Sequence, residues 1–312
     1  VAVANLFVTL FAIPKPLPRM DFSKGIPEEQ RTRVVVPTML TSTQNIEDLI
    51  RGLEVRFLAN RENQLLFGLL TDFRDAEEEH RPEDEALLQL AQCRIEELNQ
   101  KYQDHKITPF FLFHRPRRWN PQERIWMGYE RKRGKIAELN GFLRGGSNDC
   151  FSLVVGQTGA LSGVTYVITL DTDTQLARES ARQFIGAMAH PLNHARYAIL
   201  QPRVAVSLSG SSRSRYARLW TSETGIDPYT RAVSDVYQDL FDEGSFIGKG
   251  IYNVDAFEKA LKGRFPENRI LSHDLLEGCY AKAGLLSDVQ LYEEYPSSYS
   301  ADVSRRHRWI RG

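Results

Sequence analysis

The amino-acid sequence predicts an α/β protein with a mostly parallel central sheet flanked by helices. Strand-like runs in it are apolar throughout instead of alternating with polar residues, as strands buried on both faces are. These runs alternate along the chain with segments of helical spacing, which is typical of a parallel sheet covered by helices. Apolar residues make up 42% and charged residues 26% of the chain, a globular composition that excludes collagen-like and disordered proteins.

The first predicted strand and helix lie near the start of this pattern. Residues 33–38 (RVVVPT) form a short β-branched run and are predicted as a strand. Apolar residues then recur at helical spacing over 46–58. Asn45 and Asp48 are placed to satisfy the amide groups of the first turn of this helix.

The remaining elements continue the alternation. A second apolar run at 64–71 ends at Asp72, and a charged helix with a leucine stripe is predicted over 75–103. The elements predicted after it are a strand at 108–114, a strand at 164–170, a helix at 178–190 and a strand at 198–207. The loops that we expect to be mobile are 115–134, 144–163 and the serine-rich stretch 207–214.

The balance of charge and the cysteine content narrow the function classes. Lysine plus arginine and aspartate plus glutamate both number 40, so total charge indicates no dominant attraction to nucleic acid or anionic lipid. Cys93, Cys150 and Cys279 lie far apart without a CxxC pair. This spacing argues against a disulfide scaffold or a cysteine zinc site and fits a reducing compartment.

The N-terminal 13 residues are almost wholly apolar and are followed by prolines and basic residues. They are too few to cross a bilayer alone, which needs about 20 apolar residues. Because the chain also lacks an initiator methionine, we expect it to be part of a longer polypeptide, with 1–29 the end of a membrane helix and a linker. A buried strand is the alternative for the apolar run.

Two aspartates follow the strand predicted at 164–170. Asp171 and Asp173 stand at i and i+2, so in an extended chain their carboxylates point to one side. Carboxylate oxygens suit a hard divalent cation that also binds phosphate. The alternative is a solvated turn, in which Asp and Thr are common.

A third aspartate, Asp274, lies in the string SHDLLEG. It can act as a general base toward a hydroxyl group held in contact with it. The alternative is structural, since Asp274 with Glu277 three residues later fits a capping box.

Two basic segments complete the candidate residues. Arg305, Arg306, Arg308 and Trp309 lie close together near the C-terminus, where guanidinium groups suit phosphate oxygens and an indole offers a flat face to a sugar. A basic surface helix is the alternative.

The second segment, 130–140, contains Lys135 at an expected helix start, which favours phosphate. With Arg115, Arg117, Arg118 and Arg124 it forms the most basic part of the chain. A nucleic-acid surface is the rival interpretation. No helix-turn-helix, RNP or zinc-finger pattern supports it, and we predict no nucleic-acid partner. Gly244–Gly250 lacks the spacing of a phosphate-binding ATPase loop.

The order of these motifs resembles that of the processive GT-A glycosyltransferases, the group that contains cellulose and hyaluronan synthases. Longer strings are more specific and resemble the glycosyltransferase domain of cyclic β-1,2-glucan synthases, classed with glycosyltransferase families 84 and 2. These strings are 17–23, 113–116, 126–135, 197–206, 244–252, 271–278 and 306–312. The resemblance covers essentially the whole chain. It implies a GT-A fold over 30–312, with a nucleotide-sugar half at 30–175 and an acceptor and catalytic half, rich in helices, at 176–312.

The resemblance also implies an activity, which is inverting transfer of glucose from UDP-glucose to a growing β-1,2-glucan. It implies a cytoplasm-facing domain of a bacterial inner-membrane protein, with flanking membrane helices and a phosphorylase-like domain in the same polypeptide. Asp274 is the implied general base. The implied ligands of Mg²⁺ or Mn²⁺ are Asp173 and Asp171. The implied donor contacts are Thr38 and Asp72 to uridine, Lys135 to the phosphates, and Arg305 and Arg308 to the departing UDP. The implied acceptor contacts are Trp309, Gly248, Lys249 and Gly250.

The chain departs from the wider synthase pattern at two positions. His273 stands where a Glu often precedes the catalytic Asp, and Arg305 stands where a Gln often opens the closing motif. Both positions are expected to face the acceptor, so linkage is not inferred from cellulose-type enzymes. The alternative functions are another polysaccharide synthase, a nucleotidyltransferase, a non-catalytic glucan-binding scaffold and an RNA-binding domain.

Overall fold

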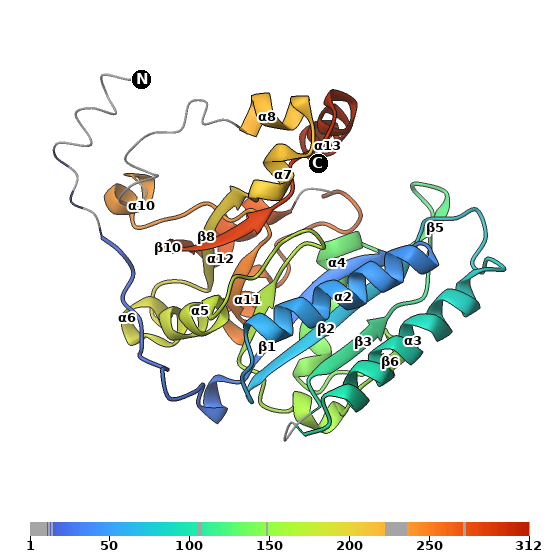
Figure 1. The fold of residues 1–312 in the computed structure, drawn as a ribbon, viewed down its shortest axis with the longest axis horizontal. Helices are drawn as coiled ribbons and strands as arrows, with labels where there is room; N and C mark the ends of the chain where they lie inside the picture. Colours follow the sequence, from blue (N-terminus) through green and yellow to red (C-terminus); the bar gives the residue numbers. More distant parts are fainter. Residues whose placement is uncertain are drawn as a thin grey trace. The chain divides into compact units, whose positions relative to one another are not determined.

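A computed structural model describes residues 11, 13, 15–104, 108–147, 149–221, 236–270 and 273–311. The chain forms two compact units (Figure 1). The N-terminal unit comprises Phe22–Thr172 and Lys262–Arg269. The C-terminal unit comprises Asp173–Leu261 and Ile270–Gly312, together with Val1–Asp21. Each unit is described by itself below.

The N-terminal unit is built on a sheet with the strand order β7-β1-β2-β3-β6. Its strands are β1 (Thr32–Leu40), β2 (Leu65–Phe73), β3 (Phe110–His114), β6 (Leu153–Val155) and β7 (Tyr166–Thr169). The neighbouring pairs are parallel except for β3 with β6. Val34, Val35 and Val36 of β1 are fully buried, and every residue of β2 is buried. Burial on both faces explains the continuous apolar runs of these strands.

Helices cover this sheet and connect its parallel strands. They are η1 (Glu28–Gln30), α2 (Thr43–Ala59), α3 (Asp84–Lys101), α4 (Arg131–Leu143) and η2 (Thr158–Leu161). The helices α2 and α3 lie side by side (Figure 1), while α2 also contacts β2 and α3 contacts β3. Ser42, and neither Asn45 nor Asp48, caps α2, because its side chain accepts a hydrogen bond from the Asn45 amide. The Asn45 side chain does accept a hydrogen bond from the Thr41 amide just before the helix. The hydrogen-bond partners of Asp48 are side chains, so its predicted capping role was wrong.

Two other predictions about local structure were also wrong in detail. The helix expected from residue 75 begins at Asp84, where the buried carboxylate pairs with Arg117. The stretch 115–134 is not a plain loop, because it contains the hairpin of β4 (Arg118–Asn120) and β5 (Ile125–Met127). A backbone bridge between Ala76 and Trp126 ties this hairpin to the segment before α3.

The C-terminal unit contains a second group of strands in the order β10-β8-β9. Its elements, in chain order, are α5 (Ser180–Ala189), α6 (Pro191–His194), β8 (Ile199–Val206), α7 (Leu208–Ser212), α8 (Arg215–Thr221), α10 (Val236–Phe241), β9 (Gly250–Asn253), α11 (Val254–Leu261), α12 (Asp274–Ala281), β10 (Ala283–Glu293) and α13 (Tyr299–Arg311). The pair β10–β8 is parallel and the pair β8–β9 is antiparallel. The helix α5 contacts all three strands.

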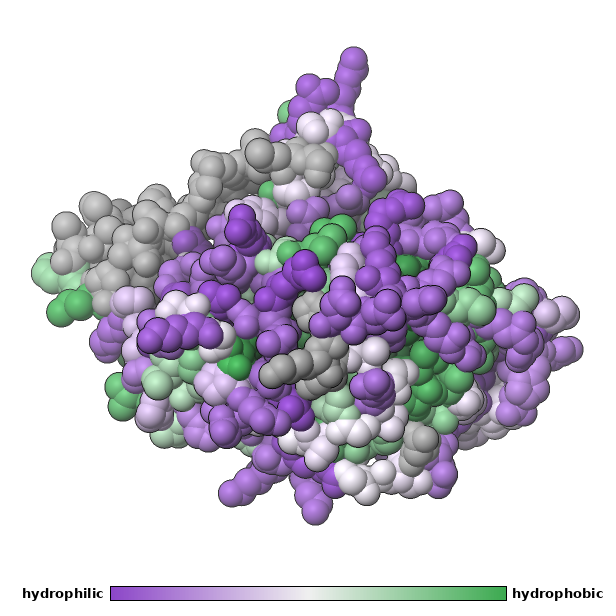
Figure 2. All heavy atoms as spheres, turned by 60° about the horizontal axis from the view of Figure 1, so that its bottom comes forward, coloured by the Kyte–Doolittle hydropathy of each residue, from purple (hydrophilic) through white to green (hydrophobic). Residues whose placement is uncertain are grey.

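The predicted fold class is confirmed, because the strands pair in a mostly parallel manner and helices flank them. Hydrophilic residues cover most of the face shown in Figure 2, and apolar residues form smaller patches between them. In the part of the chain that the structure describes, no helix combines the length and the apolar character needed to span a membrane. The apolar run 1–13 lies almost entirely outside the described residues. The functional division at residue 175 stays a prediction.

Candidate active site

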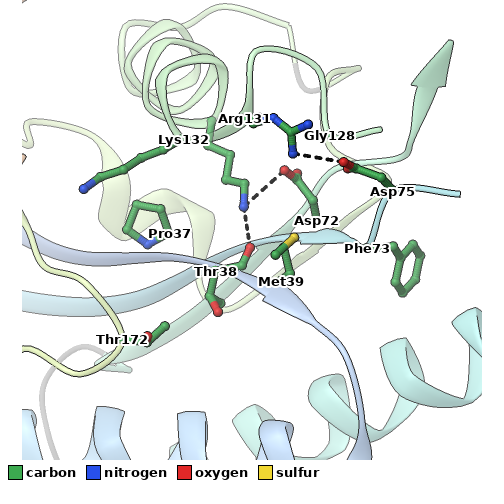
Figure 3. Close-up of a pocket in the computed structure, with 11 residues that line it drawn as sticks. Pro37, Thr38, Met39, Asp72, Phe73, Asp75, Gly128, Arg131, Lys132 and Thr172 are labelled. Atoms are coloured by element: carbon green, nitrogen blue, oxygen red, sulfur yellow. Dashed lines mark hydrogen bonds and ion pairs between the residues drawn. The ribbon is translucent and has the colours of Figure 1, made fainter. Parts of the chain in front are cut away.

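A cavity of about 320 Å³ lies beside the carboxyl ends of β1 and β2 in the N-terminal unit (Figure 3). Thr38 and Asp72 line it from these two strands, which pair so that Met39 is opposite Asp72. The full lining is Pro37, Thr38, Met39, Asp72, Phe73, Asp75, Gly128, Arg131, Lys132, Lys135 and Thr172. Parallel α/β sheets place ligands at this end of their strands, so the cavity is a candidate binding site.

Asp72 is the buried centre of a charge network at this cavity. Its side chain accepts hydrogen bonds from Arg115 Nε at 2.8 Å and from a second nitrogen of the same guanidinium at 3.0 Å. Lys135 Nζ lies 3.1 Å from Asp72 Oδ2, the oxygen that also accepts from this second nitrogen, and Glu138 Oε2 lies 3.0 Å from Arg115. The buried carboxylate is therefore compensated by two cations, as a charge removed from water must be.

Lys135 faces Asp72 instead of solvent. Its ammonium group also donates a hydrogen bond to the backbone carbonyl of Thr38. Burial lowers the pKa of Lys135, although the charge of Asp72 opposes that shift. Burial also acts to lower the pKa of Arg115, but hydrogen bonding and the charge of Asp72 raise it overall. In this arrangement Lys135 ties β1 to β2, and its contact with a donor phosphate stays a prediction.

Gly128 closes one side of the cavity where no side chain fits. A Cβ atom placed on it would overlap the carboxyl group of Asp72. The glycine therefore lets the backbone after β5 approach the carboxylate closely. Nothing in the local sequence pattern indicates this role, because it depends on a contact between positions 56 residues apart.

Asp171 follows β7 and is partly exposed. Lys132 Nζ lies 2.8 Å from its Oδ1. The buried Arg56 of α2 donates hydrogen bonds to the carbonyl oxygens of Asp171 at 3.3 Å and Thr172 at 2.7 Å, which fixes the backbone of this turn. Asp173, two residues later, is exposed. Carboxylate oxygens are donors that Mg²⁺ and Mn²⁺ accept, and the binding of such a cation by Asp171 and Asp173 stays a prediction.

Asp274 is the first residue of α12 in the C-terminal unit. The capping-box alternative is not observed, because His273 precedes the helix and no side chain caps it. His273 Nδ1 lies 2.9 Å from Glu277 Oε1 and 3.6 Å from Asp274 Oδ1. Asp274 Oδ1 is buried and accepts no hydrogen bond from any residue in the described part of the chain.

The nitrogen of His273 and one carboxylate oxygen each from Asp274 and Glu277 lie within 4.8 Å of one another. Among the described residues, this is the one set of three such side chains close enough to hold a metal ion. Sequence reasoning named His273 only as a departure from the synthase pattern and Glu277 only as a capping-box partner, and it did not predict that the two pair with each other. Their i,i+4 spacing on a helix was the available signal.

The predicted acceptor segment lies directly against Asp274. Gly248 has a φ of +83°, and a Cβ atom added to it would stand 2.5 Å from Asp274 Oδ1. Phe246 is buried against Gly278 of α12, where a side chain would collide with it. The structure therefore brings the predicted base and one predicted acceptor residue together within the C-terminal unit.

Lys249 and Gly250 have structural contacts of their own. Lys249 Nζ lies 2.8 Å from Glu293 Oε1 of β10, and this oxygen also accepts a hydrogen bond from Thr174. Gly250 has a φ of +148°, and a side chain there would overlap the carbonyl of Leu200 in β8. Both residues therefore fix the start of β9, and their contact with an acceptor stays a prediction.

Arg305 of α13 is held by the buried Asp302. Its guanidinium donates a hydrogen bond to Asp302 Oδ1 at 2.9 Å, and Arg306 and the Tyr216 hydroxyl bind the other oxygen at 3.0 and 2.9 Å. Burial acts to raise the pKa of Asp302, but these hydrogen bonds lower it overall. The backbone of Arg308 and Trp309 lies in α13, while their side chains fall outside the described part of the structure.

The basic stretch predicted as a rival nucleic-acid surface loses two of its arginines. Arg115 and Arg117 are 2% and 4% exposed and pair with Asp72 and Asp84. These two arginines therefore compensate buried carboxylates inside the N-terminal unit and do not contribute to a basic surface. A sequence alone does not show this, because the carboxylates lie 43 and 33 positions away from them.

A mostly parallel sheet with acidic side chains beside its strand ends is the architecture expected of a GT-A glycosyltransferase. The particular relative that comparison identifies is cyclic beta-(1,2)-glucan synthase NdvB of Rhizobium meliloti (strain 1021), to which this chain is 46% identical over 99% of its length. The predicted resemblance to a cyclic β-1,2-glucan synthase is thereby confirmed, while the assignment to glycosyltransferase families 84 and 2 stays a prediction. The chain spans about 11% of the length of that relative. No family model matches the chain.

Proposed function

We propose that this chain is the UDP-glucose-dependent glucosyltransferase part of a cyclic β-1,2-glucan synthase. The observation that carries the proposal is the 46% identity to such a synthase over almost the whole chain. In this proposal, residues of each unit would supply groups that the reaction needs. In our proposal the transfer inverts configuration at the anomeric carbon in one in-line displacement.

The cavity of the N-terminal unit is the proposed site for the nucleotide. Thr38 and Asp72 line it and would contact the uridine. Lys135 and Arg115 hold Asp72 in place, so its carboxylate keeps one orientation without substrate. A binding group that is already oriented loses less entropy when the ligand arrives.

Asp171 and Asp173 would hold Mg²⁺ or Mn²⁺ through carboxylate oxygens. When bound, the cation supplies neutralising charge to the diphosphate leaving group. Arg56 keeps the turn that carries Asp171 fixed through its two carbonyl contacts.

Asp274 would accept the proton of the acceptor hydroxyl. The acceptor oxygen forms a bond to the anomeric carbon, the bond from that carbon to the UDP oxygen breaks, and the proton passes to Asp274. Its Oδ1, which accepts no hydrogen bond from the described residues, supports this role. Gly248 leaves space beside the carboxylate for the sugar. A base must lie within hydrogen-bond reach of the proton that it removes.

Arg305, Arg308 and Trp309 complete the proposal. The two arginines would stabilise the charge that develops on UDP, and Trp309 would stack against the acceptor sugar. Asp302 positions Arg305 through the hydrogen bond described above. Loss of one such donor typically lowers the rate by about 10²- to 10³-fold.

The setting of the reaction is also part of the proposal. We place the chain at the cytoplasmic face of a bacterial inner membrane, in one polypeptide with flanking membrane helices and a phosphorylase-like domain. Its partners would be UDP-glucose and the growing β-glucan. The match to a relative about nine times longer supports the part of this proposal that places the chain in a longer polypeptide.

The general base is tested by Asp274→Asn in the full-length synthase. We expect UDP-glucose binding to be retained and turnover, measured as UDP release and labelled glucan, to fall by at least about 10²-fold. Asp104→Asn, at an exposed position, is the control and should change neither quantity. Near-native turnover in the Asp274 variant would remove this residue as the base.

The cation is tested separately through binding. Asp173→Ala should abolish the part of UDP-glucose binding that depends on Mg²⁺ or Mn²⁺, because it removes one of two oxygen ligands. Equal donor affinity of the variant and the native protein in the presence of Mn²⁺ would count against this assignment.

A further inference from the structure

Lys132 links the cavity of the N-terminal unit to the predicted cation ligand. It is the second residue of α4 and lines the cavity. Its ammonium nitrogen lies 2.8 Å from Asp171 Oδ1, and the two side chains are 23% and 38% exposed. Figure 3 shows the Lys132 side chain extending away from Asp72. The ion pair is therefore reached by solvent and by solutes.

The other two cations of the cavity have different attachments. Lys135 is buried against Asp72 and the Thr38 carbonyl, where its charge is needed to compensate a carboxylate. Arg131 lies 3.0 Å from Asp75 and 3.4 Å from Glu123. Lys132 differs from both because its carboxylate partner, Asp171, is a residue that we propose as a cation ligand.

Holding the Lys132 ammonium group and a divalent ion on the Asp171 carboxylate at the same time costs free energy. An ammonium group at hydrogen-bond distance from Asp171 repels a divalent ion bound to the same oxygen atoms, because like charges a few ångströms apart interact strongly near a protein surface. A nucleoside diphosphate in the cavity offers Lys132 a second anionic partner. Lysine binds phosphate as a compact point charge on a flexible stem, so a short movement is enough.

We propose that Lys132 and a divalent cation compete for the carboxylate of Asp171, and that Lys132 transfers from Asp171 to the diphosphate when the nucleotide binds. This inference rests on the proposed function and names the residue that couples its two ligands. Without the nucleotide, the Lys132 ammonium group stays paired with Asp171 and opposes cation binding there. Cation and nucleotide therefore bind better together than either does alone, because each favours the same displacement of the lysine.

The inference is tested by binding measurements on the full-length protein in detergent. Free Mn²⁺ is followed by electron paramagnetic resonance without nucleotide, and UDP affinity is then measured with Mn²⁺ present. Lys132→Met removes the charge and keeps an unbranched chain. Its Mn²⁺ affinity should rise about 2- to 5-fold, the value of one exposed ion pair. Its UDP affinity should fall at least about 10-fold, the value of a charged hydrogen bond.

Three further variants make the result specific. Lys101→Met breaks an ion pair of similar length, 2.7 Å to Glu54, that does not line the cavity, and it should shift neither affinity. Lys132→Arg keeps the charge and should stay within about 3-fold of the native protein in both affinities. Asp171→Asn should abolish the Mn²⁺ binding assigned to this site, which identifies the ligand.

Each outcome decides the inference. Unchanged Mn²⁺ affinity or unchanged UDP affinity in Lys132→Met overturns it, and so does Mn²⁺ binding that survives Asp171→Asn. These readouts contain no glucosyl transfer. If the expected shifts occur and UDP-glucose is nevertheless not consumed by the native protein, the proposed function fails and the competition at Asp171 stands.

Discussion

Replacing Gly248 by alanine tests whether Asp274 and the glycine-containing segment before β9 form one site. The added Cβ atom would stand 2.5 to 2.7 Å from the three carboxyl atoms of Asp274, whereas ordinary contacts begin at 3.4 Å. The carboxylate is the end of a side chain and can rotate, so it must move by about 1 Å. A misplacement of this size in catalytic groups costs about 10²-fold in rate.

The backbone of this position adds a separate and smaller cost. Gly248 has a φ of +83°, which alanine adopts at a cost of about 1 kcal/mol. Gly145 isolates that cost, because its φ is +80° and a Cβ atom there would meet nothing within 4 Å. Gly248→Ala and Gly145→Ala should therefore destabilise the chain by similar amounts.

The two variants should differ only in catalysis. The assay is labelled glucan formation from UDP-glucose by membranes that contain equal amounts of full-length protein. We expect turnover to fall about 10²-fold in Gly248→Ala and to stay within about 2-fold in Gly145→Ala. Turnover within 3-fold of native in Gly248→Ala, at about native protein levels, would refute the argument that Asp274 reacts beside Gly248.

Two predictions concern the N-terminal unit. Gly128→Ala should lower the free energy of unfolding, measured in urea, by about 1 to 3 kcal/mol, because the added Cβ atom overlaps the Asp72 carboxyl group. Gly141→Ala in α4, where a Cβ atom meets open space, is the control. Equal stability of the two variants would contradict the close approach of Gly128 to Asp72. Burial lowers the pKa of His114 from 6.5 to about 4. As the pH falls, the unfolded chain therefore takes up a proton at His114 before the folded chain does, and the free energy of unfolding decreases between pH 6.5 and pH 4. This decrease is about 3 kcal/mol and is measured by urea unfolding across the pH range. It should be absent in His114→Gln and present in His80→Gln, a control at an exposed position. Parallel curves of unfolding free energy against pH for the native protein and His114→Gln would contradict it.

The strands β1, β2, β3 and β7 of the N-terminal unit could be predicted from sequence because their signal is local, whereas β6 lies in the stretch 144–163 that was predicted as a loop. The run of three valines in β1 and the wholly buried β2 are uninterrupted apolar segments, and such segments indicate parallel strands directly. The helix α2 was likewise visible in its spacing. Its cap was not, since Ser42, Asn45 and Asp48 are all polar residues that suit a helix start.

The long strand β10 was missed, and its pattern explains why. Ser287 and Asp288 lie near a register shift in its pairing with β8, which breaks the apolar run that would have indicated a strand. The strand β9 was also missed, because it begins at Gly250. The need for glycine there comes from the nearby Leu200 carbonyl, which the local sequence does not show. These features belong to pairings between distant segments.

The residues of the candidate site also differ in whether the sequence identified them. Asp72, Asp171 and Asp274 were identifiable because each follows or opens a recognisable element. The partners Arg115 of Asp72 and Lys132 of Asp171 were not, because an ion pair across many positions leaves no local pattern. The sequence therefore indicated candidate groups for the chemistry, while the structure added the contacts that orient Asp72 and Asp171.

The central claim is that this chain transfers glucose from UDP-glucose to a β-1,2-glucan. The most direct measurement supplies membranes containing the full-length protein with a panel of labelled nucleotide sugars, followed by linkage analysis of the product. We predict release of UDP and β-1,2-linked glucan from UDP-glucose alone. A polymer with another linkage, incorporation of a different sugar, or no incorporation from UDP-glucose would contradict the account.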